Sequence, residues 1–332
     1  MTKKAWALGT FPFLARPEGA PDAEVRVVID NDFAGDPDDL FQVAHHVMSP
    51  GVEVRGIIAS HLRPGDAFGP GDDSAEAAER RLRELFDVMG LDAGNVIRRG
   101  AKHGLVDAST PQDSPGARVL IAEAMRDDPR PLYVCCGGGL TEVASAWLIE
   151  PRIAERLTVV WIGGPEHAGL TSPWPPIANP EYNLAIDLTA GQVVFGSDLP
   201  LWVVPRNVYR QCLVSAVELQ QRVAGSGALG AFLHEALLTV ARDAWARGAG
   251  VAETYALGDQ PLVLLTALQS FYDRDTSSSA FALVPAPELD DAGGLVGRPD
   301  GRPIRVYTHV DTRLMFEDMF GKFEVFAQWQ GE

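Results

Sequence analysis

The sequence predicts a single α/β domain built on a mostly parallel, doubly wound sheet with helices on both faces. Short runs rich in β-branched residues alternate with helical patterns, and several of these runs are continuously apolar. Continuously apolar runs are typical of strands buried on both faces. No stretch rich in Ser, Gly or Pro would split the 332 residues into separate units. We therefore expect residues 1–24 to form an irregular N-terminal arm and residues 25–332 to form one domain.

The expected elements follow this alternation along the chain. The strand-like runs lie at 25–30, 54–60, 131–136, 157–162 and 201–204. Helical patterns between them lie at 38–48, 74–89 with Ser74 as N-cap, 116–126 and 141–149. After residue 210 the patterns are mostly helical, at 215–224, 228–247 and 260–272, before a strand at 303–310 and a last amphipathic segment.

Composition restricts the classes of partner. The chain has 28 Lys and Arg against 45 Asp and Glu, a net charge of −17, which argues against nucleic acid and anionic membrane surfaces. Three cysteines, two of them adjacent, exclude a disulfide scaffold. No apolar stretch approaches the roughly 18 residues that span a bilayer, and the N-terminal residues do not read as a signal peptide. We expect a cytoplasmic protein.

The most informative segment is residues 30–39, where five carboxylates follow the first apolar strand. A helix start explains part of it, with Asp36 as N-cap and Asp38 and Asp39 as acids of the first turn. It leaves Asp30 and Asp32, which share one face of the strand end. Two like charges about 4 Å apart cost roughly 4 kcal/mol at an effective dielectric near 20, so the group needs a cation or must take up protons. Oxygen ligands select a hard ion, Ca²⁺ or Mg²⁺.

Other acidic motifs fit this segment less well. An EF-hand would place Ala34 and Phe41 where carboxylates are required, and no G-x-G-x-x-G follows the strand. The Asp30-x-Asp32 pair is similar to the nucleophile and acid of haloacid-dehalogenase phosphatases, although Ala34 departs from that pattern. A Mg²⁺-dependent phosphatase is therefore the alternative enzyme.

The ordered set of motifs resembles the Ca²⁺-dependent, inosine-uridine preferring nucleoside hydrolases. Their opening motif, strand-D-x-D-P-G-x-D-D-helix, is matched here with two residues inserted. Further similar segments follow in the same order over roughly residues 25 to 315: Gly138-Gly139-Leu140-Thr141, Ile162-Gly163-Gly164, Glu181-Tyr182-Asn183, Ile186-Asp187 and Asp259.

The resemblance implies an activity and a site. It implies hydrolysis of the N-glycosidic bond of a ribonucleoside by a homo-oligomeric enzyme, a dimer or tetramer. Ca²⁺ would be held by Asp32, Asp39, the carbonyl of Gly137 and Asp259. Asp32 would also be the general base, and Asp38, Glu181 and Asn183 would bind the sugar. We interpret Asp30 as a second-sphere support.

Some positions depart from the family pattern. Gly258 stands where the family has a His that protonates the leaving group. His61 is a candidate sugar or base contact, and Trp174, in a Pro-rich loop, is a candidate to stack on the base. His45 and His46 lie on the first helix, where we expect at least one to be exposed. The loss of the acid leaves a third hypothesis, a non-catalytic ribose-binding protein.

Overall fold

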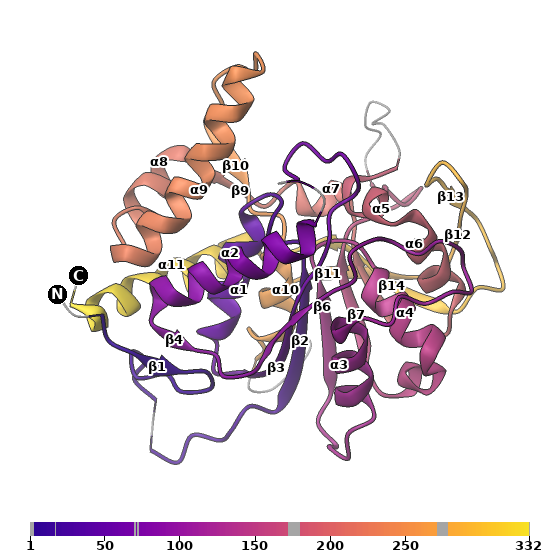
Figure 1. Ribbon diagram of the computed structural model, residues 1–332, viewed down its shortest axis with the longest axis horizontal. Coiled ribbons are helices and arrows are strands. Elements are labelled where there is room, and N and C mark those ends of the chain that lie inside the picture. The colour runs from indigo at the N-terminus through magenta and orange to yellow at the C-terminus, as the bar shows by residue number, and fades with distance from the viewer. Residues whose placement is uncertain are drawn as a thin grey trace.

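The computed structural model describes residues 3–16, 18–69, 71, 73–171, 180–270 and 278–331, and its centre is an eight-stranded sheet (Figure 1). The strand order is β11-β14-β8-β7-β6-β2-β3-β5. Every neighbouring pair is parallel except β11 with β14. The strands are β2 (Val25–Asn31), β3 (Val52–Ala59), β5 (Ile97–Arg99), β6 (Leu132–Cys136), β7 (Thr158–Ile162), β8 (Leu201–Val204), β11 (Ala280–Pro285) and β14 (Pro303–His309). The predicted fold class is confirmed.

Helices cover both faces of this sheet. Successive residues of β2 alternate between two cores: Ile29 packs in the core formed with α1, α2, α10 and α11, and Val28 in the core formed with α3, α4 and α6. The period of two along a strand produces this division. The helices of the first core are α1 (Asp38–Val47), α2 (Ser74–Met89), α10 (Pro261–Thr266) and α11 (Thr312–Gln330). Those of the second are α3 (Pro115–Ala124), α4 (Thr141–Ile149) and α6 (Leu188–Gly196).

The long elements agree with the predicted ranges within about two residues. At the start of α2, however, the N-cap is Asp73, whose side chain accepts from the N–H of Glu76 at 3.0 Å, so Ser74 is already helical. Gly90 ends this helix in the left-handed region, at φ 62°. The predicted helix at 260–272 ends earlier, at Thr266. Short elements without a clear pattern were missed, among them β5, α6 and the antiparallel edge strand β11.

The N-terminal arm is more ordered than its sequence indicates. Strand β1 (Trp6–Ala7) pairs with β4 (Leu91–Asp92). Trp6 and Phe13 are buried, with their rings 5.1 Å apart, and Phe13 also packs on Phe326 of α11. Aromatic burial therefore anchors the arm to the core, and β1 is a two-residue strand within an otherwise irregular described segment.

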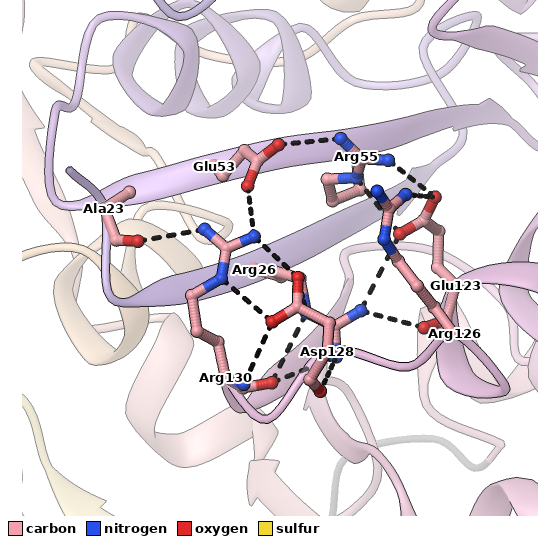
Figure 2. Close-up of polar contacts among 8 residues, drawn as sticks. All are labelled: Ala23, Arg26, Glu53, Arg55, Glu123, Arg126, Asp128 and Arg130. Atoms are coloured by element: carbon pink, nitrogen blue, oxygen red, sulfur yellow. Dashed lines mark hydrogen bonds and ion pairs between the residues drawn. The ribbon is translucent and has the colours of Figure 1, made fainter.

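A network of ion pairs lies at the amino-terminal ends of β2 and β3 (Figure 2). Buried Arg26 donates to the carbonyls of Glu123 at 2.9 Å and Arg130 at 3.0 Å, and pairs with the carboxylate of Asp128 at 3.5 Å. Arg55 connects Glu53 and Glu123. Because the strands are parallel, this network lies at the opposite end of the sheet from the acidic segment.

Among the described residues, no helix combines the length and the apolar character that a bilayer crossing requires.

Candidate metal and sugar site

The acidic segment and two Gly-rich turns meet at the carboxyl ends of the parallel strands. Asp32 follows β2, and Gly137 and Gly138 follow β6, the strand that pairs with β2. A Cβ atom on Gly138 would lie 2.9 Å from Oδ1 of Asp32, and one on Gly137 would lie 2.2 Å from Oδ2 of Asp259. Only glycine allows these carboxylates to approach the turn so closely. The strand ends are also where ligands bind in open α/β sheets.

Asp259 reaches the site from a segment far away in the sequence, just before α10. Its Oδ2 accepts a hydrogen bond of 2.7 Å from Nδ2 of Asn31, and its N–H donates to Oδ2 of Asp38 at 3.2 Å. The Oδ1 atom of Asn31 in turn accepts from the N–H of Asp32 at 3.0 Å. The structure thus brings together Asp32, Asp38, Gly137 and Asp259.

Asp39 is the most electrostatically unusual member of the group. It is 1% exposed, and neither of its carboxylate oxygens has a hydrogen-bond partner among the described residues. Burial, followed by repulsion from Asp32 and Asp259, raises the pKa of Asp39 well above its ordinary value. Without a cation, burial and repulsion therefore favour the protonated form of Asp39.

The same causes raise the pKa values of the neighbouring acids. Burial raises the pKa of Asp32 to about 7 and that of Asp36 to about 6, the latter although Tyr255 donates a hydrogen bond to it. The pKa values of Asp38 and Asp259 are also raised well above the ordinary value, by burial first and by carboxylate repulsion second in the case of Asp38. A divalent cation would relieve this accumulation of negative charge.

The donor set fits a hard cation. Its members are oxygens of Asp32, Asp39 and Asp259 and the carbonyl of Gly137, with no sulfur or imidazole among them. Across the part of the chain that the structure describes, no three His, Cys, Asp or Glu side chains already stand at metal-binding spacing. The fit therefore depends on the orphaned oxygens of Asp39 and on the chemistry of the donors.

The residues expected to bind the sugar are held by the ends of β6 and β7. Glu181 caps α5 (Tyr182–Ile186), and its Oε2 accepts from the N–H groups of Gly164 at 2.9 Å and Leu184 at 3.1 Å. Its Oε1 accepts from the hydroxyl of Tyr209 at 2.6 Å. These three donors fix the orientation of the carboxylate before any ligand binds.

Asn183 lies two residues further along the same segment. Its Nδ2 donates to the carbonyls of Gly137 at 2.6 Å and Ile162 at 2.8 Å, which links the turns after β6 and β7. Asn183 thus lies beside the carbonyl expected to bind the metal.

His61 lies inside the protein at the end of β3. It is 2% exposed, and its ring nitrogens lie 3.0 Å from the carbonyl of Leu62 and 3.1 Å from Oγ1 of Thr141. Burial lowers its pKa, so the neutral ring is favoured. Thr141 also donates to Asp187 at 2.7 Å. His61 thus has partners on both nitrogens, whereas Trp174 lies outside the described residues.

The remaining sequence expectations concern Asp30 and the two histidines of α1. Asp30 is buried and accepts a hydrogen bond from the hydroxyl of Ser60, as a supporting residue would. The expectation that His45 or His46 is exposed is wrong, because both are fully buried. Helix α1 is covered on all sides after Asp38, so its polar residues are all internal.

Sequence reasoning missed several polar residues of the site, chiefly Asn31, Gln42, Tyr209 and Tyr255. Asn31 lies within the acidic segment, between Asp30 and Asp32, but its hydrogen-bond partner Asp259 is 228 residues away. The tyrosines lie on α7 (Arg206–Tyr209) and β10 (Thr254–Ala256), in segments with no recognisable motif. No local pattern could have identified them.

Comparison with known proteins supplies the family. Residues 27–315 match the sequence profile described as inosine-uridine preferring nucleoside hydrolase. The protein of that name from Leishmania major is 33% identical over 180 residues, 47% of this chain and 56% of its own length. The one from Crithidia fasciculata is 31% identical over 104 residues, 31% of each chain. The match thus spans about half or less of these curated relatives.

Solved structures share the fold over nearly the whole chain. The inosine-uridine preferring nucleoside hydrolase of Bacillus anthracis superposes with a TM-score of 0.64 at 15% identity, covering 90% of this chain and 99% of its own. A structure named inosine-guanosine nucleoside hydrolase gives 0.67 at 18% identity, covering 91% and 99%. The profile match across most of the chain shows that this protein belongs to the inosine-uridine preferring nucleoside hydrolase family.

Proposed function

We propose that this protein hydrolyses the N-glycosidic bond of a ribonucleoside, with Ca²⁺ held at the carboxyl ends of β2 and β6. The observation that carries the proposal is Asp39, whose two buried oxygens lack partners among the described residues while Asp32 and Asp259 repel it. Family membership supports the reaction class, since this is a family of metal-dependent hydrolases that act on N-glycosyl compounds. The sugar-side residues described above support a ribosyl substrate.

Asp32, Asp39 and Asp259, with the carbonyl of Gly137, would hold the ion. When bound, Ca²⁺ lowers the pKa of a coordinated water and so makes it a better nucleophile at neutral pH. The ion also compensates the charge that burial and repulsion make costly in these carboxylates. Asp30 would support the turn from beneath, through its hydrogen bond with Ser60.

Asp32 would act as the general base. A general base must lie within hydrogen-bond reach of the proton that it accepts, and Asp32 belongs to the same group of close carboxylates as Asp39 and Asp259. Its Oδ1 faces the turn at Gly138, where a side chain would collide with it. A proton accepted there would come from the attacking water as the bond between sugar and base breaks.

The sugar would be bound from two sides. Asp38 lies on the metal side, where its Oδ2 accepts from the N–H of Asp259, and its other oxygen would accept from ribose hydroxyls. Glu181 and Asn183 would bind the sugar from the end of β7 and are already oriented by hydrogen bonds. Such preorganisation reduces the entropy lost when the substrate binds. His61 and Trp174 remain candidate contacts to the substrate.

Metal-dependent release of sugar is the direct test. The protein is stripped with chelator, and reducing sugar is measured with inosine, uridine and adenosine, with and without Ca²⁺. We expect turnover only with Ca²⁺ and none in Asp39→Ala. Metal binding without release of sugar from any riboside would favour a ribose-binding protein. A Mg²⁺-dependent phosphoryl group trapped on Asp30 would favour the phosphatase.

A further inference from the structure

A continuous chain of buried polar side chains connects Asp259 to the interior of the protein. Nδ2 of Asn31 donates to Asp259 at 2.7 Å and to Oε1 of Gln42 at 3.4 Å. Nε2 of Gln42 contacts Nδ1 of His46, and Nε2 of His46 lies 2.9 Å from Oγ1 of Thr266. The side chains belong to β2, α1, α10 and the turn before α10, and all five residues are at most 4% exposed.

The available protons determine which atom donates and which accepts at each link of this hydrogen-bond chain. The hydroxyl of Thr266 has a single proton, which it donates to the carbonyl of Leu262 at 2.6 Å. Its oxygen therefore accepts from His46, which places the ring proton on Nε2 and leaves Nδ1 as an acceptor. Gln42 must then turn its NH₂ group toward His46 and its carbonyl oxygen toward Asn31.

The direction matters at the far end of the chain. With the carbonyl of Gln42 facing it, Asn31 turns its NH₂ group toward Gln42 and Asp259, and its oxygen accepts from the N–H of Asp32 at 3.0 Å. In the opposite orientation the oxygen of Asn31 would face the carboxylate of Asp259, and the N–H of Asp32 would meet an NH₂ group. Two repulsive contacts would replace two hydrogen bonds.

We propose that His46 is a positioning residue for Asp259, which it orients through Gln42 and Asn31 in a hydrogen-bond chain of fixed direction. The proposal rests on the proposed function, because it makes His46 a determinant of the affinity of the site for Ca²⁺. It explains why a histidine is fully buried on α1 and why an amide stands between Asp30 and Asp32. Burial also keeps the His46 ring neutral, since it lowers the pKa well below the ordinary value.

Calorimetric titration with Ca²⁺ tests the chain through its variants. His46→Phe keeps the ring volume but removes the acceptor, and Gln42→Met interrupts the next link. Each should weaken Ca²⁺ binding about tenfold, the usual scale for a second-sphere partner of a metal ligand. The double variant should be no weaker than either single one, because both break the same connection. His46→Asn, which returns an acceptor near the position of Nδ1, should recover most of the affinity.

Two controls separate positioning from a general loss of structure. Ser49→Ala removes a buried hydroxyl that donates to the carbonyl of His45 at 2.8 Å, just past the end of α1 and outside the chain. It should lower the melting temperature without changing the affinity for Ca²⁺. Thr266→Val cuts the chain at its far end and replaces His46→Phe if that variant does not fold. The proposal would be overturned if His46→Phe, Gln42→Met and Thr266→Val left the affinity for Ca²⁺ unchanged, or if the losses in the double variant were additive.

A second measurement does not depend on metal. In protein labelled with ¹⁵N-histidine, the signals of His46, assigned with His46→Asn, should show a neutral ring protonated on Nε2 at pH 7. A proton on Nδ1, or a charged ring, would contradict the chain. Absence of Ca²⁺ binding by the wild-type protein would refute the proposed function, while the tautomer of His46 would still decide the chain.

Discussion

The backbone N–H of Asp259 donates to Oδ2 of Asp38 over 3.2 Å, although the two residues are 221 positions apart. Asp38 opens α1 and Asp259 precedes α10, so this bond joins the acidic segment directly to the turn before α10. The other oxygen of Asp38 stays available for a ligand. This bond therefore fixes Asp38, which is expected to bind ribose, relative to Asp259, which is expected to bind the metal.

Removing the charge of Asp39 should separate stability from metal binding. In chelator-treated protein, Asp39→Asn eliminates a buried, uncompensated carboxylate and should raise the melting temperature by at least about 2 °C. The same variant should lose measurable Ca²⁺ affinity, as should Asp259→Asn. Calorimetry and thermal denaturation of the same samples provide both values. Wild-type affinity in Asp259→Asn would remove that residue from the site.

The metal-free protein should become less stable as the pH rises from about 4 to 7. The folded-state pKa values of Asp32 and Asp36 are about 7 and about 6, against an ordinary 3.8, so between these values the folded state binds more protons than the unfolded state. The free energy of unfolding then falls with pH, by about 1.4 kcal/mol per pH unit for each extra proton that the folded state binds. Urea denaturation at several pH values measures the slope. Saturating Ca²⁺ should flatten it, and an upward slope without metal would contradict the pKa shifts.

Replacing Asp32 by Asn should affect a different property of the enzyme than replacing Asp30 by Asn. Asp32→Asn should fold normally and lose at least about a hundredfold in kcat, the scale of a general base. Asp30→Asn should alter stability or Ca²⁺ affinity more than kcat, because Asp30 is buried against Ser60. Steady-state kinetics at saturating Ca²⁺ make the comparison. A larger loss of kcat in Asp30→Asn than in Asp32→Asn would reverse the two roles.

The absence of a histidine at position 258 should appear in the choice of leaving group. A nitrophenyl riboside leaves without protonation and should react faster than inosine, uridine or adenosine. His61 is buried with both ring nitrogens bonded, so His61→Ala should not slow inosine relative to the nitrophenyl substrate. Relative kcat/KM values decide the matter. Fast inosine turnover, unchanged in His61→Ala, would show that another group supplies the proton.

Introducing a histidine at position 258 is the complementary test, because it adds the group that is missing there. A Cβ atom on Gly258 would lie 3.3 Å from both Oδ2 of Asp38 and the ring of Tyr209. Gly258→His alone should therefore disturb both neighbours and raise KM. Combining it with Tyr209→Ala relieves the contact with the ring but also removes the hydroxyl that donates to Glu181, so Tyr209→Ala alone is the control. Only the double variant should gain rate on inosine relative to the nitrophenyl riboside.

The ion-pair network at the other end of the sheet should affect stability alone. Arg26→Met leaves the carboxylates of Asp128 and Glu123 and three backbone carbonyls without their buried partner and should lower the free energy of unfolding by about 3 kcal/mol. Ca²⁺ affinity should not change, because Arg26 lies near the amino end of β2 and the acidic segment follows its carboxyl end. Arg118→Met, which removes an exposed pair with Asp113, is the control and should have little effect.

The sequence by itself determined the framework of this protein. Continuously apolar runs such as residues 25–30 produced strands buried on both faces, and the alternation with amphipathic helices produced the parallel sheet. The acidic segment after the first strand and the Gly-rich turn after residue 136 correctly located the site at the carboxyl ends of the strands. These features are local, because periodicity and turn chemistry act over a few neighbouring residues.

Only the tertiary structure decided how the marked residues are connected. The bonds of Asp259 to Asn31 and Asp38 join residues more than 200 positions apart, and the direction of the chain from Thr266 to Asn31 depends on three elements meeting. Burial of both histidines of α1 likewise follows from helices packed around it, not from its own pattern. Hydrogen-bond direction and desolvation depend on which groups surround a side chain in space, and this information is not contained in its neighbours along the chain.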